Sequence, residues 1–226
     1  MKEHVFDCLH EFHVTEPSFV VGCGPRGQSE LKHIPEHCFT IAVNGAIKYP
    51  ISADLWVCTC AAVPYVAPDV WEAGLNSGVP ALMRRDKQHV VALDRQVYMD
   101  TEKARYTMRG HHMGSQGILQ PGQRTLDEGG TAAGVSIALL YRIFEAQRFR
   151  CRTIVLNGID MEGDFNADGS RVWESDIDPW KHKRPWLRKL IDRARELGVT
   201  VVTLSRISDE IGVPLVDSAE IDRWYQ

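Results

Sequence analysis

Several features are missing from this sequence of 226 residues, and each absence excludes a class of protein. There is no repeat and no low-complexity tract, and 44% hydrophobic with 25% charged residues is typical of a globular domain. This composition excludes a disordered chain, a collagen and a coiled coil. No charge of one sign prevails, because the formal net charge is −4, which argues against binding nucleic acids through a basic face.

Long apolar runs are also missing, and none approaches the roughly 20 residues that span a bilayer. The first residues include Lys2, Glu3, Asp7 and Glu11, which make this segment too polar for a signal peptide. We therefore expect a cytoplasmic protein without a membrane span. Its six cysteines are scattered along the chain, so we expect them to be reduced thiols.

Short apolar runs alternate with helical patterns. The runs are solid blocks of apolar residues rather than strict alternations, as in parallel strands buried on both faces. They cover Ser18–Gly22, Phe39–Asn44, Asp54–Cys60, Pro80–Met83, Thr153–Leu156 and Val199–Leu204. Helices are predicted over Pro68–Leu75, Gly130–Ala146 and Trp186–Leu197. The pattern predicts one three-layer, Rossmann-like α/β domain over residues 1–226, with an insertion or lid at 86–123.

Small and polar residues follow several of these strands. In an open parallel sheet, ligands bind beyond the carboxyl ends of the strands. The segments concerned are Gly22-Cys23-Gly24-Pro25-Arg26-Gly27, Asn44-Gly45, Asn157-Gly158-Ile159-Asp160 and, before the long helix, Gly129-Gly130-Thr131. Their convergence predicts a nucleotide pocket with phosphate on exposed N–H groups. The alternative for the glycines alone is a tight strand-to-helix turn.

A dinucleotide site of the NAD or FAD type is disfavoured at the same loop. Pro25 lies inside the glycine pattern and removes one N–H group from any phosphate cradle. The second strand ends at Asn44, whereas the dinucleotide fingerprint needs an acidic residue there to hold the ribose.

The ordered motifs V-G-C-G-P-R, I-A-V-N-G-A, G-G-T and I-V-L-N-G-I-D resemble those of bacterial sialyltransferases of glycosyltransferase family 42. They also resemble the related motility-accessory-factor group and the archaeal hydroxymethylpterin diphosphokinases. The resemblance covers about residues 18–60 and 128–215. It implies an inverting glycosyltransferase with a nucleotide-sugar donor, of which a CMP-sugar is favoured, and with no metal or other cofactor.

The resemblance also implies residue roles. His182 would be the general base, because imidazole exchanges protons near neutral pH. The positions that would bind the nucleotide are Gly22, Cys23, Gly24, Pro25, Arg26, Asn44, Gly45, Gly130, Thr131, Gly134 and Asp160. The sequence departs from the family pattern at Cys23, Arg26, Ala133 and Glu162, and these departures leave the donor open.

Further candidates come from the residues themselves. Arg84, Lys183 and Arg184 could hold an anionic substrate, and Trp180 could stack on a sugar or base. Asp164–Ser170 matches half of a calcium loop but lacks its last ligand, and the doublet His111-His112 has no partner at ligand spacing. We therefore predict no metal site.

Three functions stay open at this point. The first is a glycosyltransferase that acts on a glycan or another hydroxyl acceptor. The second is a Mg²⁺-dependent, diphosphokinase-like transferase whose metal ligands would come from Asp127, Glu128, Asp160 or Glu162. The third is a nucleotide-binding protein without catalysis. The sequence leaves a homo-oligomer open.

Overall fold

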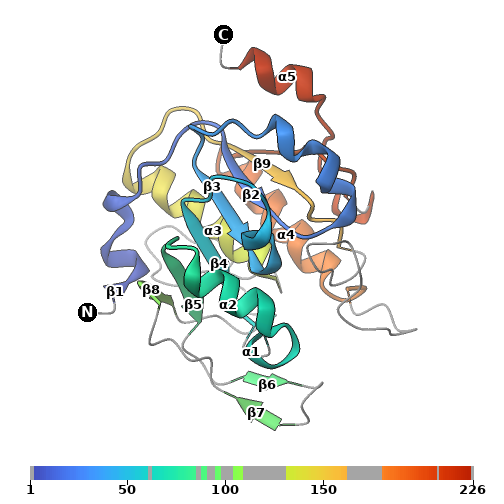
Figure 1. The fold of residues 1–226 in the computed structure, drawn as a ribbon. Coiled ribbons are helices and arrows are strands. Elements are labelled where there is room, and N and C mark those ends of the chain that lie inside the picture. Colours follow the sequence, from blue (N-terminus) through green and yellow to red (C-terminus); the bar gives the residue numbers. More distant parts are fainter. Residues whose placement is uncertain are drawn as a thin grey trace.

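The fold is known from a computed structural model that describes residues 3–60, 63–84, 88–90, 95–97, 104–108, 131–161, 180–207 and 209–224. A central sheet of eight parallel strands runs through it in the order β1-β8-β5-β4-β3-β2-β9-β10 (Figure 1). The strands are β1 (Glu3–His4), β2 (Ser18–Val21), β3 (Thr40–Val43), β4 (Leu55–Cys58), β5 (Ala81–Arg84), β8 (Tyr106–Met108), β9 (Thr153–Asn157) and β10 (Thr200–Thr203). The Rossmann-like α/β prediction is confirmed.

The six strands predicted from the sequence are all present in this sheet. Every residue of β2, β3, β4 and β5 is buried, which is why these segments are apolar without alternation. Neighbouring residues point to opposite faces, so that Val20 joins one core cluster while Phe19 and Val21 join the other. Both faces of the sheet are therefore covered.

The longest helices cover one face. Helix α3 (Ala132–Ala146) is buried at every position from Ala132 to Phe144, and α4 (Arg184–Glu196) packs beside it through residues such as Leu187 and Leu190. The other face carries shorter elements: η3 (Pro25–His33), η4 (Asn44–Lys48), α1 (Val63–Val66), α2 (Pro68–Asn76) and α5 (Ser218–Arg223). The result is a three-layer arrangement around two apolar cores. Among the described residues, no helix combines the length and the apolarity that a bilayer crossing needs.

The segment expected as an insertion contributes to two sheets. Strands β6 (Gln88–Val90) and β7 (Arg95–Val97) pair with each other as an antiparallel hairpin apart from the central sheet. Strand β8, which the sequence analysis did not predict, instead extends the central sheet by pairing with β5 and β1. The short elements η1 (Val5–Asp7), η2 (Leu9–Glu11) and η6 (Asp209–Ile211) complete the fold.

The chain reverses its direction across the sheet next to β2. From β2 it proceeds through β3, β4, β5 and β8, and α3 then returns it to β9, on the other side of β2. The carboxyl ends of β2 and β9 consequently meet where two connections leave the sheet in different directions. Such a switch point is the place where open parallel sheets form ligand crevices.

Candidate nucleotide site

A pocket lies at this switch point. Its walls come from the carboxyl ends of four strands, from α1 and α2, from the start of α3 and from the turn before α4. The lining residues are Gly22, Cys23, Gly24, Val43, Asn44, Gly45, Cys60, Val63, Val66, Ala67, Val70, Thr131, Ala132, Ala133, Gly158, Ile159, Asp160, Met161 and Trp180. Most of the wall is apolar, with a few polar groups, which is the usual character of a small-molecule site.

Eight of the lining residues belong to the set that the sequence analysis singled out: Gly22, Cys23, Gly24, Asn44, Gly45, Thr131, Asp160 and Trp180. They come from five separate segments of the chain. The structure brings these segments together at one edge of the sheet, whereas the roles assigned to the individual residues remain predictions.

The glycine loop after β2 is packed against the end of β9. A methyl group on Gly22 would lie 2.6 Å from the carbonyl oxygen of Gly158, and one on Gly24 would overlap the carboxyl group of Asp160. A methyl group on Gly27 would overlap the backbone of Gly158. The glycine pattern is therefore required by the close approach of two loops, whatever ligand the pocket binds.

The backbone N–H groups of this loop are used within the protein. Gly22 and Gly24 donate to the carbonyl oxygens of Asn157 and Gly158, at 2.8 and 2.7 Å. Gly27 donates to Gly24 at 3.0 Å. The expected cradle of N–H groups for phosphate is thus not formed by these three glycines.

Pro25 and Arg26, which complete the loop with Cys23, give the same result. Arg26 donates its N–H to Oδ2 of Asp160 at 3.2 Å, and Pro25 has no N–H group. Neither residue lines the pocket, and both are exposed. The family resemblance implied that Pro25 and Arg26 bind the nucleotide, but both belong to the start of η3 and neither is among the lining residues.

Asn44 has a strained backbone at the end of β3. Its φ of 49° lies in the left-handed region, which few residues other than glycine adopt, although asparagine is among the more tolerant. The indole N–H of Trp56 donates to the carbonyl oxygen of Asn44 at 2.9 Å and fixes this conformation. The side-chain oxygen Oδ1 is buried and has no hydrogen-bond partner among the described residues. A buried acceptor without a partner, in a residue that lines the pocket, is a candidate contact for a ligand.

The start of α3 forms another wall. The hydroxyl of Thr131 accepts the N–H of Gly134 at 2.9 Å and caps the helix. Gly134 is therefore buried inside the helix. It was expected to bind the nucleotide, but it does not line the pocket. Ala132 and Ala133 line the pocket instead, and Gly130 lies outside the described residues.

The turn before α4 separates the residues that the sequence analysis grouped there. Trp180 lines the pocket, and the ammonium group of Lys183 lies 4.2 Å from the centre of its ring. His182 is exposed, does not line the pocket and contacts Trp186 edge-on, with ring centres 5.5 Å apart. Its role as a general base stays a prediction.

Arg184, which was expected to hold an anionic substrate, points into the protein, and its role toward a substrate stays a prediction. Its side chain is buried, its Nε donates to the carbonyl oxygen of Met161 at 3.0 Å, and Nη1 lies 3.7 Å from a carboxylate oxygen of Glu210. Met161 lines the pocket and has a left-handed φ of 58°. Arg184 therefore supports the pocket wall from behind.

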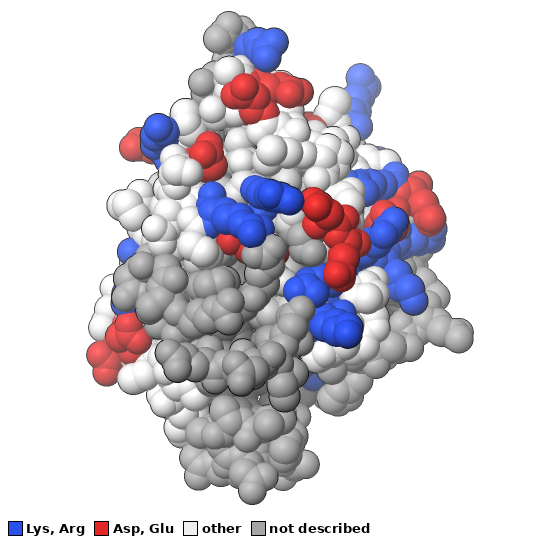
Figure 2. Space-filling model, turned by 90° about the vertical axis from the view of Figure 1, so that its right-hand side faces the viewer, with Lys and Arg blue, Asp and Glu red and all other residues white. Residues whose placement is uncertain are grey.

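The other predicted residues lie elsewhere. Arg84 is buried at the end of β5 and is not among the lining residues. On the face of the molecule in Figure 2, Lys and Arg lie next to Asp and Glu. The predicted positions that fall outside the described residues are Asp127, Glu128, Gly129, Gly130, Glu162, Asp164–Ser170 and His111-His112.

Sequence reasoning missed much of the apolar wall. Val63 and Val66 of α1, with Ala67 and Val70, line the pocket. Helix α1 has four residues, too few to give a periodic signal. Cys60 also lines the pocket. It ends the predicted strand Asp54–Cys60, but it was not assigned to the site.

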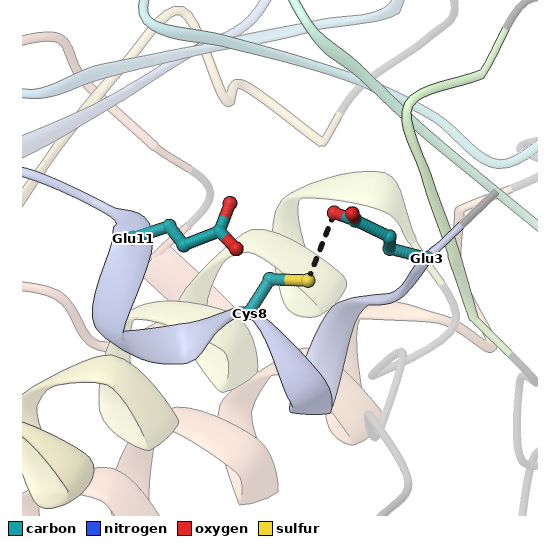
Figure 3. A group of neighbouring side chains, drawn as sticks. All are labelled: Glu3, Cys8 and Glu11. Atoms are coloured by element: carbon teal, nitrogen blue, oxygen red, sulfur yellow. Dashed lines mark hydrogen bonds between the residues drawn. The ribbon is translucent and has the colours of Figure 1, made fainter. Parts of the chain in front are cut away.

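One group of potential metal ligands lies in the described residues (Figure 3). It consists of Glu3, Cys8 and Glu11, whose ligand atoms lie within 4.8 Å of one another. The thiol of Cys8 donates to Glu3 at 3.2 Å, and Arg105 lies 3.3 Å from Glu11. Burial, helped by this hydrogen bond, raises the pKa of Cys8 to about 12. The thiol is therefore protonated and serves as the donor of this hydrogen bond.

Comparison with known proteins finds a similar fold in a solved structure but no matching sequence family. No protein-family model matches the chain, and no curated protein matches it. The structure is similar to that of the MAf glycosyltransferase from Magnetospirillum magneticum AMB-1, with a TM-score of 0.51 and 18% sequence identity. The match covers 94% of this chain and 37% of that chain, so the present chain spans little more than a third of its neighbour's length. At this identity the likeness establishes a shared fold.

Proposed function

We propose that the protein is a glycosyltransferase that binds a nucleotide-sugar donor, with a CMP-sugar favoured, in the pocket at the end of β2, β3 and β9. The observation that carries the proposal is the pocket itself, which lies at the switch point of an all-parallel sheet. Five segments that the sequence predicts to bind the ligand contribute residues to its lining. The fold shared with a glycosyltransferase supports it, as do the strand-end motifs.

The proposed reaction is a displacement at the anomeric carbon of the donor sugar. A hydroxyl group of a glycan or another acceptor forms the new bond, the nucleotide leaves with the electrons of the old one, and His182 takes the acceptor proton. His182 lies two residues from Trp180 in the turn that borders the pocket, and its exposure leaves room for an acceptor from solvent. This step requires no metal from the protein.

Binding can be tested with two exposed cysteines of the same chain. Cys60 lines the pocket, whereas Cys151 precedes β9 and does not. CMP, UMP, GMP and AMP are each added before alkylation, and the two sites are followed by mass spectrometry. A nucleotide in the pocket slows the alkylation of Cys60 and leaves Cys151 unchanged. Equal rates at Cys60 with and without every nucleotide would contradict the proposal.

The general base is tested by turnover. Nucleotide release is measured with a panel of nucleotide-sugars and acceptors, and His182→Ala is compared with Lys181→Ala, a substitution at the adjacent exposed position. Loss of a general base lowers kcat by about 10²–10⁴-fold, and the neighbouring substitution leaves it unchanged. Full turnover by His182→Ala would exclude this role. Loss of activity in EDTA, restored by Mg²⁺, would instead favour the diphosphokinase-like reaction.

A further inference from the structure

The carboxylate of Asp160 occupies the place in the glycine loop where a phosphate was expected. Its side chain is 3% exposed, its Oδ2 accepts the N–H of Arg26 at 3.2 Å, and Gly24 lies directly against its carboxyl group. Arg26 belongs to the first turn of η3, where an anion is favoured by the helix dipole and by the N–H groups. The protein thus supplies its own anion to this loop.

The other N–H groups leave little for a second anion. Gly22, Gly24 and Gly27 donate to backbone oxygens, and Pro25 has no N–H, so at most that of Cys23 remains to a ligand. A phosphate at this wall would also meet the negative charge of Asp160 in a site of low dielectric constant. A carboxylate is an acceptor with room for several hydrogen bonds, and it favours a ligand that donates them.

We propose that Asp160 binds hydroxyl groups of the sugar ring of the ligand, and that the phosphate points away from the glycine loop toward Lys183. The ring of Trp180 lines the pocket and holds the ammonium group of Lys183 at 4.2 Å from its centre. This cation–π contact still allows the ammonium hydrogens to reach an anion. The neighbouring Arg184 is buried and donates to Met161, whereas Lys183 is half-buried and lies beside the pocket, next to Trp180, without lining it.

This inference rests on the proposed function, because it assumes a ligand with a sugar and a phosphate. It assigns the direction of that ligand in the pocket, from hydroxyl groups at β9 to phosphate at the turn before α4. The sequence had suggested the opposite direction, with the phosphate over the glycines. The two directions predict opposite effects when the charge of Asp160 is removed.

The test uses calorimetry on the full chain. The probes are the 5′-monophosphate that best protects Cys60, its nucleoside, and the 2′,3′-dideoxynucleoside monophosphate. Asp160→Asn keeps an acceptor for Arg26 and removes the charge, and Asp209→Asn, at an exposed position of η6, is its control. Lys183→Met keeps an aliphatic chain over Trp180, with Lys181→Met as its control.

We expect Asp160→Asn to raise the Kd of the monophosphate and that of the nucleoside by a similar factor of about ten or more. This is the effect of losing hydrogen bonds to a charged group. The dideoxy compound should be insensitive to this substitution. Lys183→Met should weaken the binding of the monophosphate and leave the affinity for the nucleoside unchanged. If the hydroxyl groups belong to the donor sugar instead of the ribose, Asp160→Asn weakens only the nucleotide-sugar.

Other outcomes overturn the inference and separate it from the proposed function. Tighter binding of the monophosphate to Asp160→Asn would place the phosphate at the glycine loop, with the proposed function intact. Unchanged binding of the monophosphate, nucleoside and nucleotide-sugar would remove Asp160 from ligand recognition. No binding of any nucleotide or nucleotide-sugar to the wild-type protein would overturn both proposals.

Discussion

Replacing Asn44 with glycine is expected to stabilise the ligand-free protein and to weaken nucleotide binding. Asn44 lies in the pocket wall with a left-handed φ of 49°, and its Oδ1 is buried with no hydrogen-bond partner among the described residues. Both features are unfavourable in the empty pocket. A function that needs the amide would account for their presence, since binding sites often lower the stability of the fold.

The size of the effect follows from three contributions. Removing a buried acceptor without a partner is worth about 1–3 kcal/mol. Relief of the left-handed backbone adds up to about 1 kcal/mol for a non-glycine residue. The greater freedom of glycine in the unfolded chain lowers the free energy of unfolding by about 0.5–1 kcal/mol. With some loss of side-chain contacts, we expect Asn44→Gly to raise the free energy of unfolding by about 1 kcal/mol, or the Tm by about 2–4 °C.

Urea unfolding of the wild-type protein, Asn44→Gly and Asn44→Ala measures these contributions. The alanine variant also lacks the amide but keeps the backbone strain, so it should fall below the glycine variant by about 1 kcal/mol. A saturating nucleotide should stabilise the wild-type protein more than either variant. The reasoning is refuted if Asn44→Gly unfolds at a lower urea concentration than the wild type, because the amide would then support the fold.

Three further predictions concern the surroundings of the site. Gly74→Ala should destabilise the protein by about 1–3 kcal/mol in urea unfolding, because the methyl group would overlap the ring of Trp56; helix propensity alone predicts a gain. Arg184→Met should lower stability by a similar amount, about 1–3 kcal/mol, since the carbonyl of Met161 loses its donor, and calorimetry should show weaker nucleotide binding. The raised pKa of Cys8 keeps its thiol protonated, so alkylation at pH 8 should be slower there than at the two exposed cysteines, and equal rates would contradict this assignment.

The sequence predicted six neighbouring strands of the sheet, β5 to β10 in spatial order, and missed the two strands at one side. The predicted strands are blocks of buried apolar residues, and burial on both faces leaves a clear signal over four or five positions. Strands β1 and β8 have only two and three residues and lie at one side of the sheet. Their pairing depends on contacts between segments about a hundred residues apart, which a local pattern does not contain.

The candidate site was predicted in its position more than in its chemistry. A phosphate cradle and a close packing of two loops both require glycine, so the pattern of Gly22, Gly24 and Gly27 could not distinguish them. The difference lies in Gly158 and Asp160, which are more than a hundred residues further along the chain. Long-range partners of this kind decide whether a glycine loop faces a ligand or the protein.

The basic turn before α4 has the same limitation. Lys181, His182, Lys183 and Arg184 form one cationic run in the sequence, but successive residues of a helix start point in directions about 100° apart. Lys181 and His182 are exposed, Lys183 lies over Trp180, and Arg184 is buried. A run of charge therefore predicts the presence of cations at a site without predicting which of them a ligand can reach.

The packing of the two loops also divides the pocket into a fixed and a variable part. Gly22, Gly24 and Gly158 cannot accept a side chain without separating β2 from β9, so this wall has little freedom to adapt to a ligand. Other lining residues, such as Val66 and Ala133, carry apolar side chains rather than backbone contacts between the two strands. The choice among nucleobases and sugars should therefore lie in the apolar wall, while the glycine loop and its carboxylate keep one orientation for every ligand.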